Sequence, residues 1–176
     1  MERNSGILLH PTSLPDSHVC GSFGNPARSW LNELAVSGIG VWQFLPLAPT
    51  DLFGSPYSSP SSFAFNPWFL DQNDLVRDGF LANNSEKSSS ENECFDKRVD
   101  FQLANSKVNS LRSSLVDYWE KQNRTIQEEF EIWCSRQFWL DDHSIFMELK
   151  IQYNDLPWWE WRDKYSFRDK KELVSW

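Results

Sequence analysis

The chain has 176 residues, the size of one domain, and 40% of them are apolar, which is enough for a hydrophobic core. Its formal net charge is -8 at pH 7, with Lys+Arg 17 and Asp+Glu 25, so it lacks the basic excess with which proteins neutralise a phosphate backbone. Nucleic acid is therefore excluded as an expected partner.

The first 47 residues have the pattern of one βαβ unit. The short apolar run "GILLHP" predicts a strand, and "VWQFLPL" predicts a second one. Between them, "NPARSWLNELAVSG" predicts a helix with Asn25 as N-cap, Pro26 at the first helical position and Gly38 at its end. We expect the two strands to be parallel and buried on both faces.

Polar, conformationally restricted segments follow both predicted strands. They run from His10 to Pro15 and from Thr50 to Pro67, and the second contains "GSPYSSPSSFAFNP". The carboxyl ends of parallel strands carry the ligand sites of barrel and doubly wound folds. These two segments therefore form the candidate site face.

Helices dominate the pattern after this face. A short helix is expected after Pro67, capped by Asp71 or Asn73 and stopped by Gly79. Residues 83–93, "NNSEKSSSENE", predict a mobile loop, and helical spacing from Phe101 to about Lys150 predicts two or three helices, ended by Pro157. Two or three strands leave a sheet unfinished, and a (β/α)₈ barrel needs about 250 residues. The pattern is that of the first part of a larger fold.

Few residues have a pattern that indicates chemistry. Asp51 directly follows the second strand and has the position of a turn aspartate, while Asp141 and Asp142 suit a helix start. Two residue types that could bind metal are too dispersed for a site: the histidines are His10, His18 and His143, and the cysteines are Cys20, Cys94 and Cys134. We expect no metal, no cofactor and no disulfide framework.

The sequence also bears on location. No segment approaches the roughly 20 apolar residues of a membrane-spanning helix, and the N-terminal apolar run is too short for a secretory signal. Scattered, unpaired cysteines fit a reducing compartment. We expect a cytoplasmic location and no membrane partner.

Tyr57 is the most informative single residue. Pro56 restricts its backbone, and a rigid ring with a hydroxyl tip suits sugar recognition, although the ring can equally anchor the loop in the core. His10 is either a structural histidine or a residue that orients the site loop. The ten Trp can likewise fill a core or stack on sugar rings.

Several stretches resemble one family in both order and spacing. They are "GILLHPTSLP", "VWQFLPLAPTD", "GSPYSSPSSFAFNPWFLD", "LVRDGFL" and "WLDDHSIFMELK". Together they are similar to the 4-α-glucanotransferases, the amylomaltase or disproportionating-enzyme family, from Ser5 to about Trp161. The resemblance implies an α/β fold, the N-terminal part of a (β/α)₈ TIM barrel with an inserted helical subdomain, the barrel being incomplete in this chain.

The resemblance also implies an organisation and a function. Residues 1–80 would supply the first strands and the glucan-site loop, 81–100 a mobile loop, and 101–176 the helical insertion. The family transfers α-1,4-glucan segments to the 4-hydroxyl of an acceptor glucose or maltodextrin through a covalent glycosyl-enzyme intermediate. The implied partners are therefore α-1,4-glucans and acceptor glucose.

Site residues carry over only where the motif matches. Ser55 and Tyr57 match the Ser-Pro-Tyr motif that lines the sugar site, and His10 and Asn66 are candidates for supporting the site face. The sequence "DLFG" before this motif departs from the usual Gly-Tyr-Gly-Asp or Gly-Gly, and Phe65 replaces a glycine.

No catalytic residue can be assigned in this chain. The family's aspartate nucleophile, glutamate acid/base and third aspartate lie on later strands, so we expect an N-terminal fragment that is inactive alone. Two alternatives remain open: a non-catalytic α-glucan-binding module, and the front part of an amylase-group glycoside hydrolase.

Overall fold

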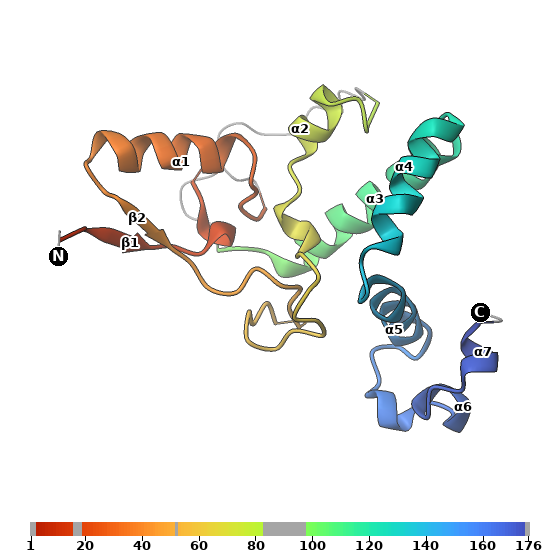
Figure 1. Ribbon diagram of the computed structural model, residues 1–176. Helices are drawn as coiled ribbons and strands as arrows, with labels where there is room; N and C mark the ends of the chain where they lie inside the picture. Colours follow the sequence, from red (N-terminus) through yellow and green to blue (C-terminus); the bar gives the residue numbers. More distant parts are fainter. Residues whose placement is uncertain (1–2, 16–18, 52, 83–97, 175–176) are drawn as a thin grey trace. The chain divides into compact units, whose positions relative to one another are not determined.

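The computed structural model describes a chain with two compact units, Met1–Arg124 and Thr125–Trp176 (Figure 1). The residues that it describes are 3–15, 19–51, 53–82 and 98–174. We treat each unit by itself. The predicted loop at 83–93 lies outside the described residues, and the predicted division at residues 80 and 100 stays a prediction.

The first unit begins with the predicted βαβ arrangement, coloured red and orange in Figure 1. Strands β1 (Gly6–Leu8) and β2 (Val41–Gln43) pair in parallel, with Ile7 opposite Trp42, and α1 (Asn25–Val36) connects them. The indole Nε1 of Trp42 donates a 2.8 Å hydrogen bond to the Leu9 carbonyl, which extends the pairing beyond β1. The parallel strands are confirmed.

Two local expectations for this unit were wrong. The N-cap of α1 is Gly24, because Asn25 already lies inside the helix and its Oδ1 accepts from the Arg28 guanidinium instead. The strands are not buried on both faces: Leu8 is 58% and Val41 46% exposed. Within the described residues the sheet has two strands, so much of its apolar surface remains uncovered.

The chain after β2 returns through a long loop to a 3₁₀ turn, η2 (Pro67–Phe69), and then to α2 (Gln72–Arg77). Asp71 caps α2 by accepting from the Asp74 amide, as predicted. Gly79 ends this segment with a φ of +83°, a left-handed conformation that glycine adopts without strain. A second 3₁₀ turn, η1 (Pro11–Ser13), follows β1 and packs near η2.

The core of the first unit lies where η2 meets the long helix α3 (Phe101–Glu120). Cys20, Trp68 and Ala104 are buried there. Partly buried apolar side chains pack around them, namely Val19, Val99, Phe101 and Val108. The segment after η1, the η2 turn and α3 therefore share one apolar cluster.

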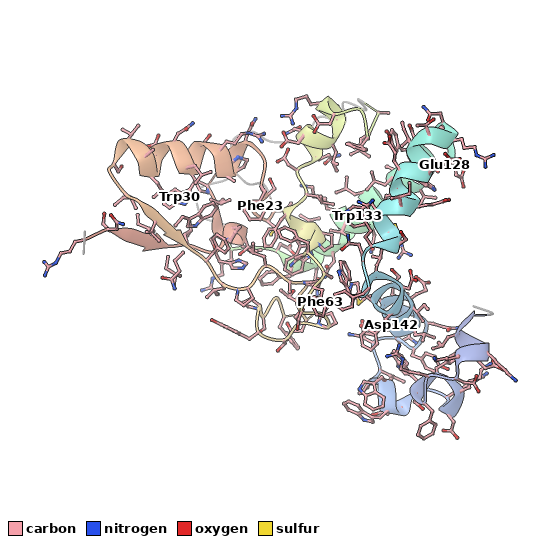
Figure 2. The ribbon with its side chains drawn as sticks, in the orientation of Figure 1. Phe23, Trp30, Phe63, Glu128, Trp133 and Asp142 are labelled. Carbon is pink, nitrogen blue, oxygen red and sulfur yellow. The ribbon has the colours of Figure 1, made fainter. Side chains whose placement is uncertain are left out.

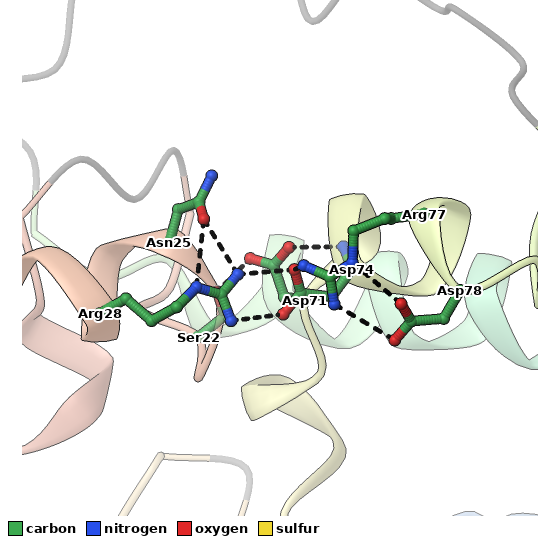
Figure 3. Close-up of polar contacts among 7 residues, drawn as sticks. All are labelled: Ser22, Asn25, Arg28, Asp71, Asp74, Arg77 and Asp78. Atoms are coloured by element: carbon green, nitrogen blue, oxygen red, sulfur yellow. Dashed lines mark hydrogen bonds and ion pairs between the residues drawn. The ribbon is translucent and has the colours of Figure 1, made fainter.

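A polar cluster ties the start of α1 to α2 (Figure 3). Arg28 donates to both carboxylate oxygens of Asp74, at 2.7 and 3.0 Å, and Arg77 pairs with the same carboxylate at 2.8 Å. The Ser22 hydroxyl donates to Asp71 at 2.6 Å. These bonds fix α2 beside the βαβ unit.

The second unit consists of short helical elements. They are α4 (Arg124–Ser135), which begins at the boundary, α5 (Leu140–Gln152), η3 (Trp158–Glu160), α6 (Asp163–Ser166) and α7 (Lys170–Val174). Trp161 is buried and stacks on Tyr153 with ring centroids 5.6 Å apart. The prediction of up to three helices from Phe101 to about Lys150 is confirmed by α3, α4 and α5, and the pattern breaks before Pro157 as expected.

The described residues are thus mostly helical, with one small parallel sheet. None of the helices found in them is long and apolar enough to cross a membrane.

Candidate functional site

The segments that leave β1 and β2 lie side by side. The Leu9 amide donates to the Gln43 carbonyl at 3.0 Å, and His10 Nε2 lies 3.5 Å from the Pro46 carbonyl oxygen. Both segments continue from the carboxyl ends of parallel strands, as the sequence predicted. This edge of the sheet is the candidate site face.

His10 holds the base of this face. Its Nδ1 accepts from the Thr12 amide at 3.4 Å and lies 2.9 Å from the Thr12 hydroxyl, so the hydrogen is assigned to Nε2, which points at Pro46. Burial lowers the pKa of His10 below its ordinary value, against the opposing effect of the Pro46 carbonyl. The centroid of the neutral ring lies 5.8 Å from that of the Phe69 ring, so His10 packs against η2 at the base of the site face.

Asp51 organises the start of the long loop after β2. Its Oδ1 accepts from the Phe53 amide at 3.0 Å and from the Ser55 amide at 2.9 Å, and its carbonyl accepts from the Gly54 amide at 3.1 Å. This is the turn aspartate that the sequence predicted. One oxygen of the carboxylate, Oδ1, is thus engaged by amides of its own loop, which is the structural role of a turn residue.

Ser55 and Tyr57 share one turn of this loop, in which Ser55 is half-buried and Tyr57 is exposed. The Ser58 amide donates to the Ser55 carbonyl at 3.2 Å and closes a turn around Pro56 and Tyr57. The Tyr57 side chain is 75% exposed, so it is not packed into the core of the described chain. Its ring and hydroxyl are open to a ligand from solvent.

Asn66 closes the loop at its other end. Its amide donates to the Leu47 carbonyl at 3.0 Å, and its Oδ1 accepts from the Trp68 amide at 3.0 Å, which caps η2. The side chain is only 2% exposed, and its Nδ2 has no acceptor among the described residues. Asn66 and His10 thus flank residues 46 and 47 at the base, beneath the part that carries Tyr57.

Metal chemistry receives no support from the part of the chain that the structure describes. No group of three or more His, Cys, Asp or Glu side chains is gathered there in a way that could hold an ion. Asp141 and Asp142 lie in the first turn of α5, where carboxylates favour the helix dipole.

Comparison with known proteins shows the family to which the chain belongs. A family model described as 4-alpha-glucanotransferase matches residues 9–176. The chain belongs to this family. Among relatives, a 4-alpha-glucanotransferase of Synechocystis sp. is 34% identical over 177 residues, covering 99% of this chain and 35% of the relative. That of Thermus thermophilus is 36% identical over 98% of this chain and 34% of the relative.

A solved amylomaltase has the same fold over the shared region. The structure titled amylomaltase from Streptococcus agalactiae in complex with acarbose matches with a TM-score of 0.82 and 29% identity, over 99% of this chain and 35% of that one. The chain therefore spans about a third of the length of the relatives that it matches. The matching family model is that of the family that the sequence motifs resemble.

Reasoning from the 4-alpha-glucanotransferase motifs missed one part of the candidate site, a cluster of aromatic rings next to the loop. Phe23, labelled in Figure 2, lies at its centre, with ring centroids 5.2 Å from Phe69, 6.1 Å from Phe65 and 6.3 Å from Trp42. One signal in the sequence was present, because Phe65 stands where the family usually has a glycine. Its ring packs on that of Phe23.

Proposed function

We propose that this chain forms one wall of the α-1,4-glucan site of a 4-α-glucanotransferase. One observation carries the proposal: Tyr57 is exposed on a constrained loop at the carboxyl ends of two parallel strands. The family match and the likeness to an amylomaltase crystallised with acarbose support it. In this proposal β1 and β2 are the first strands of a (β/α)₈ barrel, and transfer to the 4-hydroxyl of an acceptor sugar retains configuration through a double displacement.

The proposed roles follow from how far each side chain is exposed to solvent. The Tyr57 ring can pack on the apolar face of a glucose unit while its hydroxyl bonds a sugar hydroxyl, and the Ser55 hydroxyl lies in the same turn. His10 and the buried Asn66 hold the base of the loop and do not reach the sugar. Residues 1–80 supply the strands and loop, and the helices within 101–176 form an insertion beside the glucan groove.

Catalysis would need groups beyond those assigned here. A retaining transfer uses two carboxyl groups about 5 Å apart, one as nucleophile and one as acid/base. Asp51, the carboxylate nearest to Tyr57 in sequence, has its Oδ1 engaged by two loop amides. We therefore expect the 176-residue chain to bind glucan without transferring it. We also propose a cytoplasmic location, although relatives from Arabidopsis thaliana and Oryza sativa are named as chloroplastic/amyloplastic.

Calorimetric titration with maltoheptaose tests the site. The wild-type chain should show saturable binding, and Tyr57→Ala should weaken it by about 5- to 30-fold, the effect of losing 1 to 2 kcal/mol of stacking and hydrogen bonding. Tyr165→Ala, in the second unit, is the matched control and should bind as the wild type does. Equal affinities for wild type and Tyr57→Ala would contradict the proposed role.

A second candidate function, a glucan-binding module without catalysis, is favoured by one observation. Trp158 and Trp159 present exposed rings, 51% and 65%, in the second unit. If they form a platform for sugar rings, Trp159→Ala should reduce maltoheptaose affinity while Tyr57→Ala leaves it unchanged. In either case the pure chain should release no glucose from maltotriose, and such release would refute the assignment of catalysis to residues outside this chain.

A further inference from the structure

We propose that Phe101, the first residue of α3, is a positioning residue for the turn that carries Ser55 and Tyr57. It acts through the backbone of Gly54, which rests on its ring. The effect on sugar binding depends on the proposed glucan site, but the effect on the turn does not.

The contact between Gly54 and Phe101 leaves no room for a side chain. A Cβ added at Gly54 would lie 2.4 Å from Cζ, 2.5 Å from Cε1 and 2.6 Å from Cε2 of the Phe101 ring. Gly54 also has a φ of +76°, a left-handed conformation that other residues adopt only with strain. The backbone immediately before Ser55 is therefore seated directly on this ring.

The ring of Phe101 is itself held in place. It stacks on Trp68 with centroids 5.1 Å apart and an interplanar angle of 23°. Trp68 is buried, and its Nε1 donates to Asn105 Oδ1, one turn further along α3, at 2.9 Å. Asp100 caps the helix by accepting from the Leu103 amide, and its own amide donates to the Val19 carbonyl at 3.4 Å. The support under Gly54 is thus part of the core and not a loose surface contact.

Between Gly54 and the closure at Asn66 the loop also packs through Phe65, whose ring centroid lies 6.1 Å from those of Phe23 and Phe69. On one side of Gly54 the turn is fixed by Asp51, through bonds within the loop itself. At the far end the Asn66 amide bonds the Leu47 carbonyl. Phe101 is the residue of another element that lies directly against Gly54, next to Ser55. Without this support the turn would have to be ordered at the expense of binding energy when sugar binds.

Amide hydrogen exchange of the 176-residue chain tests the positioning role without any sugar. On peptides that span residues 53–60, Phe101→Ala and Phe101→Leu should exchange about tenfold faster than the wild type, because local opening becomes easier. Phe101→Tyr keeps the ring and should restore wild-type protection. Leu111→Ala, a buried position about three turns further along α3, is the control for loss of helix packing and should leave this peptide unchanged. Unchanged exchange in both Phe101→Ala and Phe101→Leu would overturn the proposal.

A double-mutant cycle tests the contact directly. Gly54→Ala introduces the Cβ that collides with the ring, so it should lower the urea midpoint more in the wild-type background than in Phe101→Leu, where the ring is gone. Additive effects would show that Gly54 and Phe101 are not coupled and would refute the contact on which the proposal rests.

Maltoheptaose titration then separates this inference from the proposed function. With the glucan site in place, Phe101→Ala should bind several-fold more weakly and Phe101→Tyr as the wild type. Wild-type affinity in Phe101→Ala despite faster exchange would refute the link to sugar binding. If the wild-type chain binds no maltoheptaose, the proposed function fails while the exchange and cycle results still decide whether Phe101 positions the turn.

Discussion

His10 Nε2 lies 3.5 Å from the carbonyl oxygen of Pro46, so a single imidazole spans the segments that leave the two parallel strands. The ring keeps this position in its neutral form, with Nδ1 accepting from Thr12. Protonation of Nδ1 would remove that acceptor, and charging a partly buried ring is unfavourable.

The first prediction concerns the pH dependence of stability. In the folded chain, burial lowers the pKa of His10 below its ordinary value of 6.5. As the pH falls, the unfolded chain therefore takes up the proton before the folded chain does. The stabilisation is therefore present above pH 6.5 and is lost as the pH falls through the lower folded-state pKa. Thermal melts of wild type and His10→Gln between pH 7.5 and 5 should show a shallower loss of Tm in the variant.

His143 is the internal control for this experiment, because burial lowers its pKa too. His143→Gln should remove its own share of the pH dependence, and the double variant should be flatter than either single one. A wild-type pH profile retained in His10→Gln would show that His10 titrates as it does in the unfolded chain.

The second prediction uses the buried amide of Asn66. Asn66→Asp keeps the acceptor for the Trp68 amide but places a carboxylate where the side chain is 2% exposed. Burial should raise the pKa of that carboxyl above about 3.9, so the variant should be most stable in acid and lose stability as the pH rises through its folded-state pKa. Urea unfolding at pH 4 and pH 7 measures this.

Asn109→Asp provides the matched control for the same change of charge, on the exposed side of α3. It should show no comparable loss between pH 4 and pH 7. Equal behaviour of the two variants would mean that position 66 is open to water.

The third prediction concerns thiol reactivity. Burial raises the pKa of Cys20 to about 11, against the opposing effect of Lys107, and the thiol lies in the core with Trp68 and Ala104. In a Cys94→Ser background, iodoacetamide at pH 8 should modify the half-buried Cys134 and leave Cys20 intact until urea unfolds the chain. Mass spectrometry of the digested protein locates the label, and labelling of Cys20 at the rate of Cys134 in the native chain would contradict the buried position.

The fourth prediction compares two polar contacts of α2. Asp71→Ala removes the cap of this helix and the acceptor of the Ser22 hydroxyl, so it should lower the free energy of unfolding by about 1 kcal/mol. Arg28→Ala breaks an exposed ion pair with Asp74 and should cost less, because solvent screens such pairs. Urea unfolding in low salt and in 1 M NaCl separates them: salt should shrink the Arg28 effect and leave the Asp71 effect. The reverse order of losses would contradict this account.

Local chemistry in the sequence predicted much of the fold. Gly38, Asp71 and Gly79 end or cap helices as expected, because these positions depend on the backbone preferences of single residues. The position of the site loop followed from strand direction alone. The sequence analysis missed the N-cap at Gly24, because the neighbouring Asn25 is also a residue type that is preferred at N-caps.

Contacts between distant segments could not be predicted in this way. That Tyr57 is exposed while Asn66 is buried depends on how the loop folds back on residue 47. The seat of Gly54 on Phe101 depends on the packing of η2 against α3, to which no pattern within either segment points. The exposure of β1 and β2 likewise depends on what covers a sheet and not on the composition of its strands.

The described tryptophans differ widely in exposure, and this gives the chain a built-in optical label. Trp68, buried against Phe101 in the first unit, should emit at short wavelength and resist quenching by iodide. Trp133, Trp158 and Trp159, all about half exposed or more in the second unit, should emit at longer wavelength and be quenched. Trp161 of the second unit is buried as well, so the short-wavelength emission should report the buried rings of both units, and the iodide-quenched emission the exposed rings of the second unit.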